Sequence, residues 1–177
     1  RNLGGRPGVI FGRKGQVPDE DTWGIENQTL IAKKGFRGEI ITKRSFLNYE
    51  FSLEYKLLEG TSDSGVGIFA GEPDQGYLEI QLYNQRSGDL YKIGAAQIVT
   101  DDGNPLGFRS SKFKDANEEK WGEWNKMEIR VSDGQSEIKV NGEVQNRALS
   151  KDPRPSKIVL RNEGTGVKFR NLLLKKL

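Results

Sequence analysis

Short segments in which apolar and polar side chains alternate with a period of two constrain the fold of this chain more than any other feature. In "YEFSLEYKLL", residues 49–58, every second side chain from Phe51 to Leu57 is apolar or aromatic, and those between them are polar. This is the pattern of a strand with one face toward a core. Roughly a dozen such segments occur, and turns rich in Gly, Asn or Asp separate them. This spacing predicts a β-sandwich or barrel rather than βαβ units, with a single helical turn at "KDANEEKWGEW".

Two dipeptides predict tight hairpins. Asp133-Gly134 and Asn141-Gly142 each stand between alternating segments, and both favour the positive φ angles of two-residue hairpin turns. Together they predict a three-stranded meander from Trp124 to Val144. The side chains expected to face the core from it are Met127, Ile129, Val131, Ile138 and Val140.

The composition agrees with one domain over residues 1–177. The chain is 34% hydrophobic and 30% charged, with 22 Gly, which suits one-sided sheets joined by many turns. Strands that are apolar on one face and carry aromatic, carboxylate and amide groups on the other indicate a sandwich with a concave outer sheet. We therefore predict an all-β fold, a jelly-roll sandwich of two antiparallel sheets.

Several classes of function are excluded by residue counts. The 28 basic and 25 acidic residues nearly balance, so we expect no nucleic-acid partner. Without Cys or His, the chain has no disulfide, no Ser-His-Asp triad and no His-ligated zinc. No apolar run is long enough to span a membrane.

We expect no bound cofactor, although calcium is an alternative at one loop. The segment "TDDGNPLGF", Thr100 to Phe108, is acidic and rich in the oxygen ligands that calcium prefers. It lacks the regular ligand spacing of an EF-hand, so an ordinary surface loop is the other interpretation.

The segment "GYLEIQLYN" carries the most informative polar face. Leu78, Ile80 and Leu82 are expected to point into the core. The opposite face carries Tyr77, Glu79, Gln81 and Tyr83. Tyrosine rings suit the C–H faces of sugars, and carboxylate and amide groups suit paired hydroxyls, so this face predicts a carbohydrate groove. A solvated outer face with tyrosines as good β formers is the alternative.

Several segments resemble one family in the right order over about residues 23–177. They include "DSGVGIFA", "GYLEIQLYN", "GEWNKMEIRVSDGQSEIKVNGEVQ" and "VKFRNLLLKKL". The chain resembles the bacterial 3-keto-disaccharide hydrolase domain family, which implies a concanavalin A-like jelly roll related to laminarinases and laminin-G-like domains. Family members often have His-Gly where this chain has "RNEG", Arg161 to Gly164, so any activity would rely on Asn162, Glu163 and the carboxylates instead.

The resemblance implies a keto-sugar, which needs fewer catalytic groups than an ordinary glycoside. A ketone at C3 acidifies the C2 proton, so one base and one group that stabilises the enolate suffice. We predict Glu79 as the base, and Lys92, Arg109 or Arg170 as the stabiliser. Ordinary two-acid hydrolysis on this strand is not expected, because Gln81 stands where a second acid would be.

Two of the predicted site residues have a structural alternative. Glu54 is the best available second carboxylate, and a surface salt bridge with Lys56 or Lys92 is its alternative. Arg170 on the last strand would otherwise tie a sheet edge or a buried carboxylate. The remaining side chains predicted to bind substrate are Tyr77, Gln81, Tyr83, Lys92, Arg109 and Asn162.

Three functions stay open at this point. The first is a hydrolase or lyase acting on 3-keto-disaccharides or related glycosides. The second is a non-catalytic glycan-binding module, which the missing histidines favour, and the third is a structural interaction domain. In each case we expect carbohydrate or protein partners and an extracytoplasmic location, whether periplasmic, secreted or attached to the cell surface.

Overall fold

A computed structural model describes residues 22–71, 75–115 and 117–177, and all fourteen of its regular elements are strands. They are β1 Trp23–Glu26, β2 Thr29–Ala32, β3 Arg37–Ile41, β4 Tyr49–Leu57, β5 Asp63–Ala70, β6 Tyr77–Tyr83, β7 Leu90–Ile93, β8 Ile98–Thr100, β9 Arg109–Ser110, β10 Asn125–Ser132, β11 Gln135–Val140, β12 Glu143–Ser150, β13 Lys157–Glu163 and β14 Val167–Lys176. The two-residue strand β9 was not predicted from the sequence, and a strand predicted at residues 8–11 lies outside the described residues.

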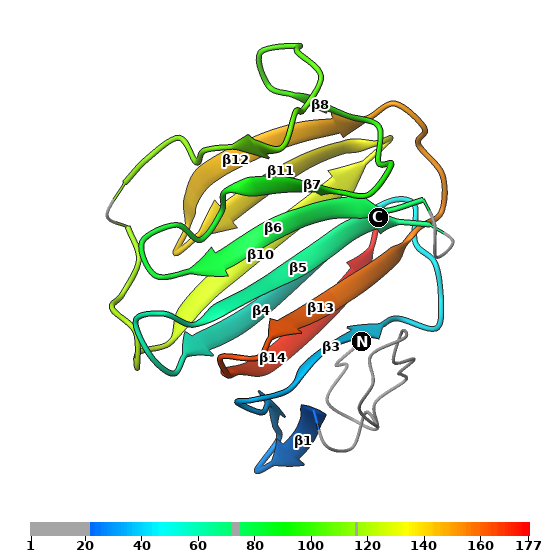
Figure 1. Ribbon diagram of the computed structural model, residues 1–177. Coiled ribbons are helices and arrows are strands. Elements are labelled where there is room, and N and C mark those ends of the chain that lie inside the picture. The colour runs from blue at the N-terminus through cyan, green and yellow to red at the C-terminus, as the bar shows by residue number, and fades with distance from the viewer. Residues whose placement is uncertain (1–21, 72–74, 116) are drawn as a thin grey trace.

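The strands form two antiparallel sheets, which are seen as two layers in Figure 1. One sheet has eight strands in the order β1-β2-β14-β4-β10-β11-β12-β8. The other has six strands in the order β3-β13-β5-β6-β7-β9. The strand order mixes distant parts of the sequence in both sheets, as in a jelly roll, so the predicted fold class is confirmed.

One apolar core fills the space between the sheets. Leu78, Ile80 and Leu82 are each 0% exposed in it, which confirms the predicted register of β6. The facing sheet contributes the apolar side of β4 and the predicted meander. The meander residues buried there are Met127, Ile129, Val131, Ile138 and Val140.

Both predicted hairpin turns are present. Asp133 and Gly134 have φ angles of 50° and 80° between β10 and β11. Asn141 and Gly142 have φ angles of 49° and 85° between β11 and β12. Left-handed backbone at both positions matches the right-handed twist of the flanking strands, which is why these dipeptides fix the meander.

The helical turn predicted at residues 114–124 is wrong within the described part of that segment. Its polar groups bind residues of β10 and β11 instead. Asn117 donates to the carbonyl of Val140 at 2.5 Å, and Asn125 Oδ1 accepts from the amide of Glu119 at 2.8 Å. These contacts with a neighbouring strand satisfy polar groups that a helix would otherwise pair locally.

A buried ion pair closes the same loop. Lys112 Nζ lies 2.6 Å from Glu118 Oε1, and the two side chains are only 3% and 1% exposed. Glu118 Oε1 also accepts from the amide of Ser87, at 3.0 Å, in the turn between β6 and β7. The pair therefore links the loop after β9 to the six-stranded sheet.

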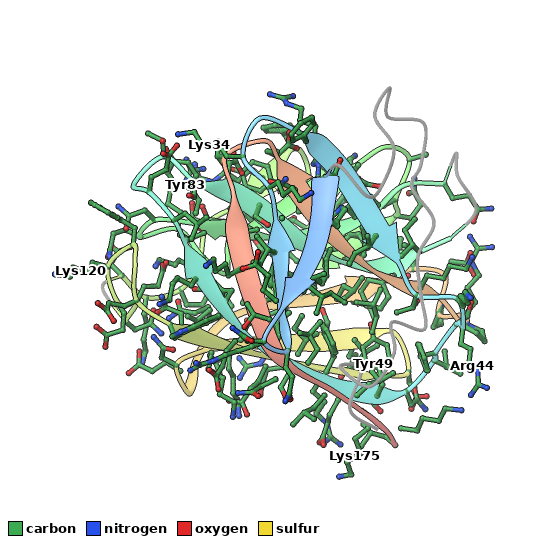
Figure 2. All side chains as sticks on the ribbon, turned by 90° about the horizontal axis from the view of Figure 1, so that it is seen from below. Lys34, Arg44, Tyr49, Tyr83, Lys120 and Lys175 are labelled. Carbon is green, nitrogen blue, oxygen red and sulfur yellow. The ribbon has the colours of Figure 1, made fainter. Side chains whose placement is uncertain are left out.

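Most other charged side chains lie on the outside of the molecule, and Glu79 and Asp89 are buried exceptions. Figure 2 shows Arg44, Lys120 and Lys175 on different sides of it. Within the described residues, no helix has the length and hydropathy to cross a membrane.

Leu53 is a direct test of the core. Leu53→Ala should lower the free energy of unfolding by about 2–5 kcal/mol, because the side chain is 1% exposed and its removal leaves a cavity in the core. Urea denaturation followed by tryptophan fluorescence measures the loss. Leu173→Ala, on the same sheet but 49% exposed, should change stability far less, and equal losses would contradict this core assignment.

Candidate functional site

The outer face of the six-stranded sheet, the face turned away from the core, carries the predicted site strand β6. Tyr77, Glu79 and Gln81 on this face are only 3%, 4% and 8% exposed. Tyr83, at the end of the strand, is half-buried. The row is therefore not a solvated surface, so its polar groups must find partners within the protein.

Two glycines on the neighbouring strand make room for this row. A Cβ atom on Gly65 would lie 2.2 Å from Glu79 Oε1, and one on Gly67 would lie 2.8 Å from the ring of Tyr77. The side chains of Glu79 and Tyr77 thus lie flat across β5. The segments "DSG" and "Glu-x-Gln" are therefore linked in space. Gly65, the glycine of the first segment, leaves the space that the carboxylate of Glu79 in the second segment occupies.

Arg161 on β13 holds the carboxylate of Glu79. Its Nη1 donates to Glu79 Oε2 at 2.9 Å. Two further carboxylates contact the same guanidinium, Glu39 at 3.8 Å and Glu163 at a shorter distance. One half-buried arginine therefore faces three carboxylates, which makes this end of the outer face acidic.

The pKa of Glu79 is raised to about 7. Burial is the main cause, since it disfavours the charged carboxylate. Arg161 opposes this rise, while the nearby charges of Glu163 and Asp63 add to it. Glu79 is thus a carboxyl group that gains and loses its proton near neutral pH, which is the property of a general base or acid.

Tyr77 and Gln81, which flank Glu79 on the outer face of β6, bind other carboxylates. The hydroxyl of Tyr77 donates to Glu39 Oε1 at 2.5 Å, and Gln81 Nε2 donates to Asp63 Oδ1 at 2.6 Å. The ring of Tyr77 packs in a small apolar cluster on the outer face with Ile41, Ala70, Val159 and Ile93. The prediction that Tyr77 stacks on a sugar is therefore wrong, because its ring faces are covered by protein.

Aromatic and arginine side chains lie beside Glu79 on β7 and β9. Tyr91 is the cross-strand partner of Glu79, and Arg109 is the partner of Tyr91. The guanidinium of Arg109 lies 5.8 Å from the centre of the Tyr91 ring and donates to the buried carboxylate of Asp89 at 2.7 Å. The structure thus places the predicted site residue Arg109 on the same face as Glu79.

Glu54 and Arg170 lie on the wrong sheet for this site. They pair with each other, with 2.6 Å between Arg170 Nε and Glu54 Oε2, on the outer side of the eight-stranded sheet. Arg170 also stacks on Trp124, 4.0 Å from the ring centre. Because the whole core separates that surface from Glu79, the predicted roles of Glu54 as second carboxylate and Arg170 as enolate stabiliser are wrong. Arg170 does bind a carboxylate, but that of Glu54 is 26% exposed rather than buried, and β14 lies between β2 and β4 rather than at a sheet edge.

Lys92 and Asn162 also face away from the outer face. Lys92 pairs with Leu78, so its side chain leaves the sheet on the core side of β7. Asn162 is 1% exposed and donates to the carbonyls of Lys33 and Phe36 at 2.9 and 2.8 Å, which fixes the connection between β2 and β3. The prediction that these two side chains bind substrate is wrong, because the alternation of their own strands directs them inward.

The acidic loop at residues 100–108 satisfies its own polar groups. Asp102 Oδ1 accepts from the hydroxyl of Thr100 at 2.6 Å, and Asp102 Oδ2 accepts from the amide side chain of Asn104 at 2.9 Å. Within residues 22–71, 75–115 and 117–177, no group of three or more His, Cys, Asp or Glu side chains is arranged to hold a metal ion.

A pocket of about 190 Å³ contains none of the predicted site residues. It is smaller than the roughly 300–1,000 Å³ usual for ligand sites. Its one carboxylate, Asp152, is paired with Arg154 at 3.2 Å. The outer face around Glu79 therefore remains the better candidate site.

Sequence reasoning missed Arg161, the closest partner of Glu79. A signal was present, since alternation along "KIVLRNE" separates Arg161 and Glu163 from the inward-facing Ile158 and Leu160. Tyr91 was missed in the same way, although "DLYKI" places it opposite Leu90. Strand alternation is enough to show that Arg161 and Tyr91 point outward. It does not show that they lie next to Glu79, because that depends on how the strands pair in the sheet.

A jelly roll with a carboxylate, an arginine and tyrosines on one sheet face belongs to the class of carbohydrate-related β-sandwich proteins. More particularly, the chain belongs to the 3-keto-alpha-glucoside-1,2-lyase-like domain family, whose model matches residues 12–175. This confirms the resemblance seen in the sequence. We found no curated protein that is similar to the chain.

Solved structures of low sequence identity share the fold. A candidate glycosyl hydrolase from Parabacteroides distasonis is 20% identical with a TM-score of 0.66, covering 91% of this chain and 93% of that one. The carbohydrate-binding module CBM66 from Bacillus subtilis is 9% identical with a TM-score of 0.64, covering 88% and 91%. The β-glucanase of Bacillus licheniformis is 9% identical with a TM-score of 0.66, covering 96% and 92%.

Proposed function

We propose that this chain cleaves 3-keto-α-glucosides by elimination, with Glu79 as the general base. The observation that carries the proposal is a buried carboxylate with a pKa of about 7, held by an arginine on the outer face of the six-stranded sheet. Membership of the 3-keto-alpha-glucoside-1,2-lyase-like family supports the substrate class.

The proposed reaction needs one base. Glu79 removes the proton from C2 of the keto-sugar, and the electrons of that C–H bond form an enolate on the former C3 ketone. As the enolate collapses, the bond between C1 and the glycosidic oxygen breaks, and the leaving oxygen takes up the proton that Glu79 removed from C2, which returns Glu79 to its carboxylate form. The products are an unsaturated keto-sugar and the free alcohol, and addition of water to the unsaturated sugar completes a net hydrolysis.

Arg161 is the group best placed to favour this chemistry. It is half-buried and within hydrogen-bond distance of Glu79, so its positive charge stands beside the region where negative charge develops. The surrounding carboxylates, Glu39 and Glu163, keep the guanidinium fixed on the sheet. A fixed donor requires little reorganisation during the reaction, which is the physical basis of enolate stabilisation.

The pH dependence of turnover tests the role of Glu79. A base must be deprotonated, so kcat/KM for a 3-keto-α-glucoside should rise about tenfold per pH unit at low pH and level off above about pH 7. The direction follows from the raised pKa, because an ordinary Glu would already be deprotonated near pH 5. Stopped assays of product between pH 4.5 and 9 measure the profile, and an acidic limb centred near 4.5 would contradict the assignment.

Glycan binding without catalysis is the second candidate function. The ion pair of Glu79 with Arg161 favours it, because a side chain only 6% exposed and already paired is also suited to a purely structural role. In that case wild-type protein should release no product from 3-keto-α-glucosides, while calorimetry with the same sugars should still detect heat of binding.

A further inference from the structure

We propose that the leaving saccharide unit binds on Tyr91 and Phe108 and carries an anionic group, a carboxylate or sulfate, that Arg86 and Arg109 recognise. This rests on the proposed function, since it names the substrate class of the same site. The evidence is the position, shape and charge of these side chains beside Glu79.

The position follows from strand register. Glu79, Tyr91 and Arg109 are directly paired across β6, β7 and β9, so they form one row on the outer face. Neighbouring strands are about 4.8 Å apart, so the Cα atoms of Glu79 and Arg109 are about 10 Å apart, and the Glu79 carboxylate, which leans over β5, lies somewhat farther from Arg109. Two linked sugar rings span a comparable length. The carboxylate of Glu79 lies on the β5 side of this row. A sugar whose reacting ring lies over β6, between that carboxylate and β7, and whose next ring extends along the row therefore reaches Tyr91.

The shape is that of a stacking surface. The rings of Tyr91 and Phe108 meet edge to face, with 5.4 Å between their centres. Phe108 is 75% exposed, the highest exposure among the large apolar side chains that the structure describes. An exposed aromatic that is held by a second ring offers an ordered apolar face to the C–H groups of a sugar.

The charge differs between the two ends of the row. Near Glu79, the carboxylates of Glu39 and Glu163 share Arg161, so that end is acidic. At the other end, Arg86 and Arg109 share the single carboxylate of Asp89, at 3.2 and 2.7 Å. The leaving unit therefore meets an excess of positive charge.

Both arginines are fixed yet accessible. Asp89 is 2% exposed, while the side chains of Arg86 and Arg109 are 40% and 37% exposed. Each guanidinium also lies on an aromatic ring, Arg86 on Tyr83 at 5.5 Å and Arg109 on Tyr91 at 5.8 Å. Arg109 uses Nε and Nη2 on Asp89, and Arg86 uses Nε on Asp89 and Nη2 on the hydroxyl of Tyr91. The Nη1 groups are the donors that these two fixed guanidinium groups offer to a carboxylate or sulfate.

Matched aryl glycosides test the charge preference. The probes are phenyl, 4-carboxyphenyl and 4-sulfophenyl 3-keto-α-glucosides, with binding measured by calorimetry on Glu79→Gln protein so that no turnover occurs. The anionic probes should bind roughly tenfold more tightly than the phenyl probe at low salt, and the difference should shrink at 1 M salt. The 4-carboxyphenyl probe tests a carboxylate, and the 4-sulfophenyl probe carries a sulfonate that stands in for a sulfate, so their affinities show which kind of anion this surface prefers.

Two substitutions assign the effect to this surface. Arg109→Gln, in the Glu79→Gln background, should remove most of the preference for the anionic probes. Phe108→Ala should weaken all three probes about three- to tenfold, because the ring is exposed and its loss does not disturb the core. Leu173→Ala, an exposed apolar residue on the other sheet, is the control and should change none of them.

The outcomes separate this inference from the proposed function. Turnover of the phenyl probe by wild-type protein, combined with equal affinity for charged and uncharged probes, would overturn the anionic preference alone. Absence of turnover with all three probes would overturn the proposed function. Tighter binding of the anionic probes that survives Arg109→Gln and Arg86→Gln would place the anion elsewhere and also overturn the inference.

Discussion

Glu79→Gln should reduce turnover of a 3-keto-α-glucoside by about two to four orders of magnitude while leaving its binding nearly unchanged. Glutamine keeps the size of the side chain and can still accept the hydrogen bond from Arg161, but it cannot take up a proton. It also resembles the protonated acid, which is the form that burial favours below about pH 7, so the fold should be preserved. Product assays and calorimetry on the same preparation measure the two effects.

Glu54→Gln is the matched control for that experiment. It makes the same chemical change on the outer side of the eight-stranded sheet, where Glu54 binds Arg170. Turnover should stay at the wild-type level. Similar losses from both substitutions would point to a general effect on stability and contradict a specific role for Glu79, and full activity of Glu79→Gln would exclude it as the base.

Lys112→Met should lower the free energy of unfolding by about 3–5 kcal/mol. The substitution keeps most of the length of the side chain but leaves the carboxylate of Glu118, 1% exposed, without its cation. Glu118 Oε1 would lose the hydrogen bond from Lys112 Nζ and keep the one from the amide of Ser87. Urea denaturation monitored by circular dichroism measures the change.

A second substitution separates lost charge pairing from lost packing. In the double variant Lys112→Met with Glu118→Leu, most of the stability should return, because two apolar side chains can replace a buried ion pair. Lys114→Met is the control at an exposed pair, 62% and 47% exposed, and should cost only about 0–1 kcal/mol. If Lys112→Met costs no more than this control, the buried pair does not stabilise the loop.

Features that depend on local geometry were predictable from the sequence. Successive side chains of a strand point to opposite faces, so alternation along β4, β6 and β10 indicated the buried residues without knowledge of any neighbour. The turns at Asp133-Gly134 and Asn141-Gly142 were equally local, because they depend on the positive φ angles that these dipeptides favour. The fold class and one side of the site strand followed from these patterns.

The partners of Glu79 were decided by the tertiary structure. Arg161 is 82 residues away in the sequence, and only the pairing of β13 with β5 and of β5 with β6 brings the two together over Gly65. Glu54 shows the reverse case. Its strand alternates like β6, but alternation does not say which sheet a strand joins, and β4 joined the other one. The sequence by itself determined which face of each strand is polar. The order of strands in the two sheets determined which polar faces meet. That order depends on long-range packing, which no local pattern encodes.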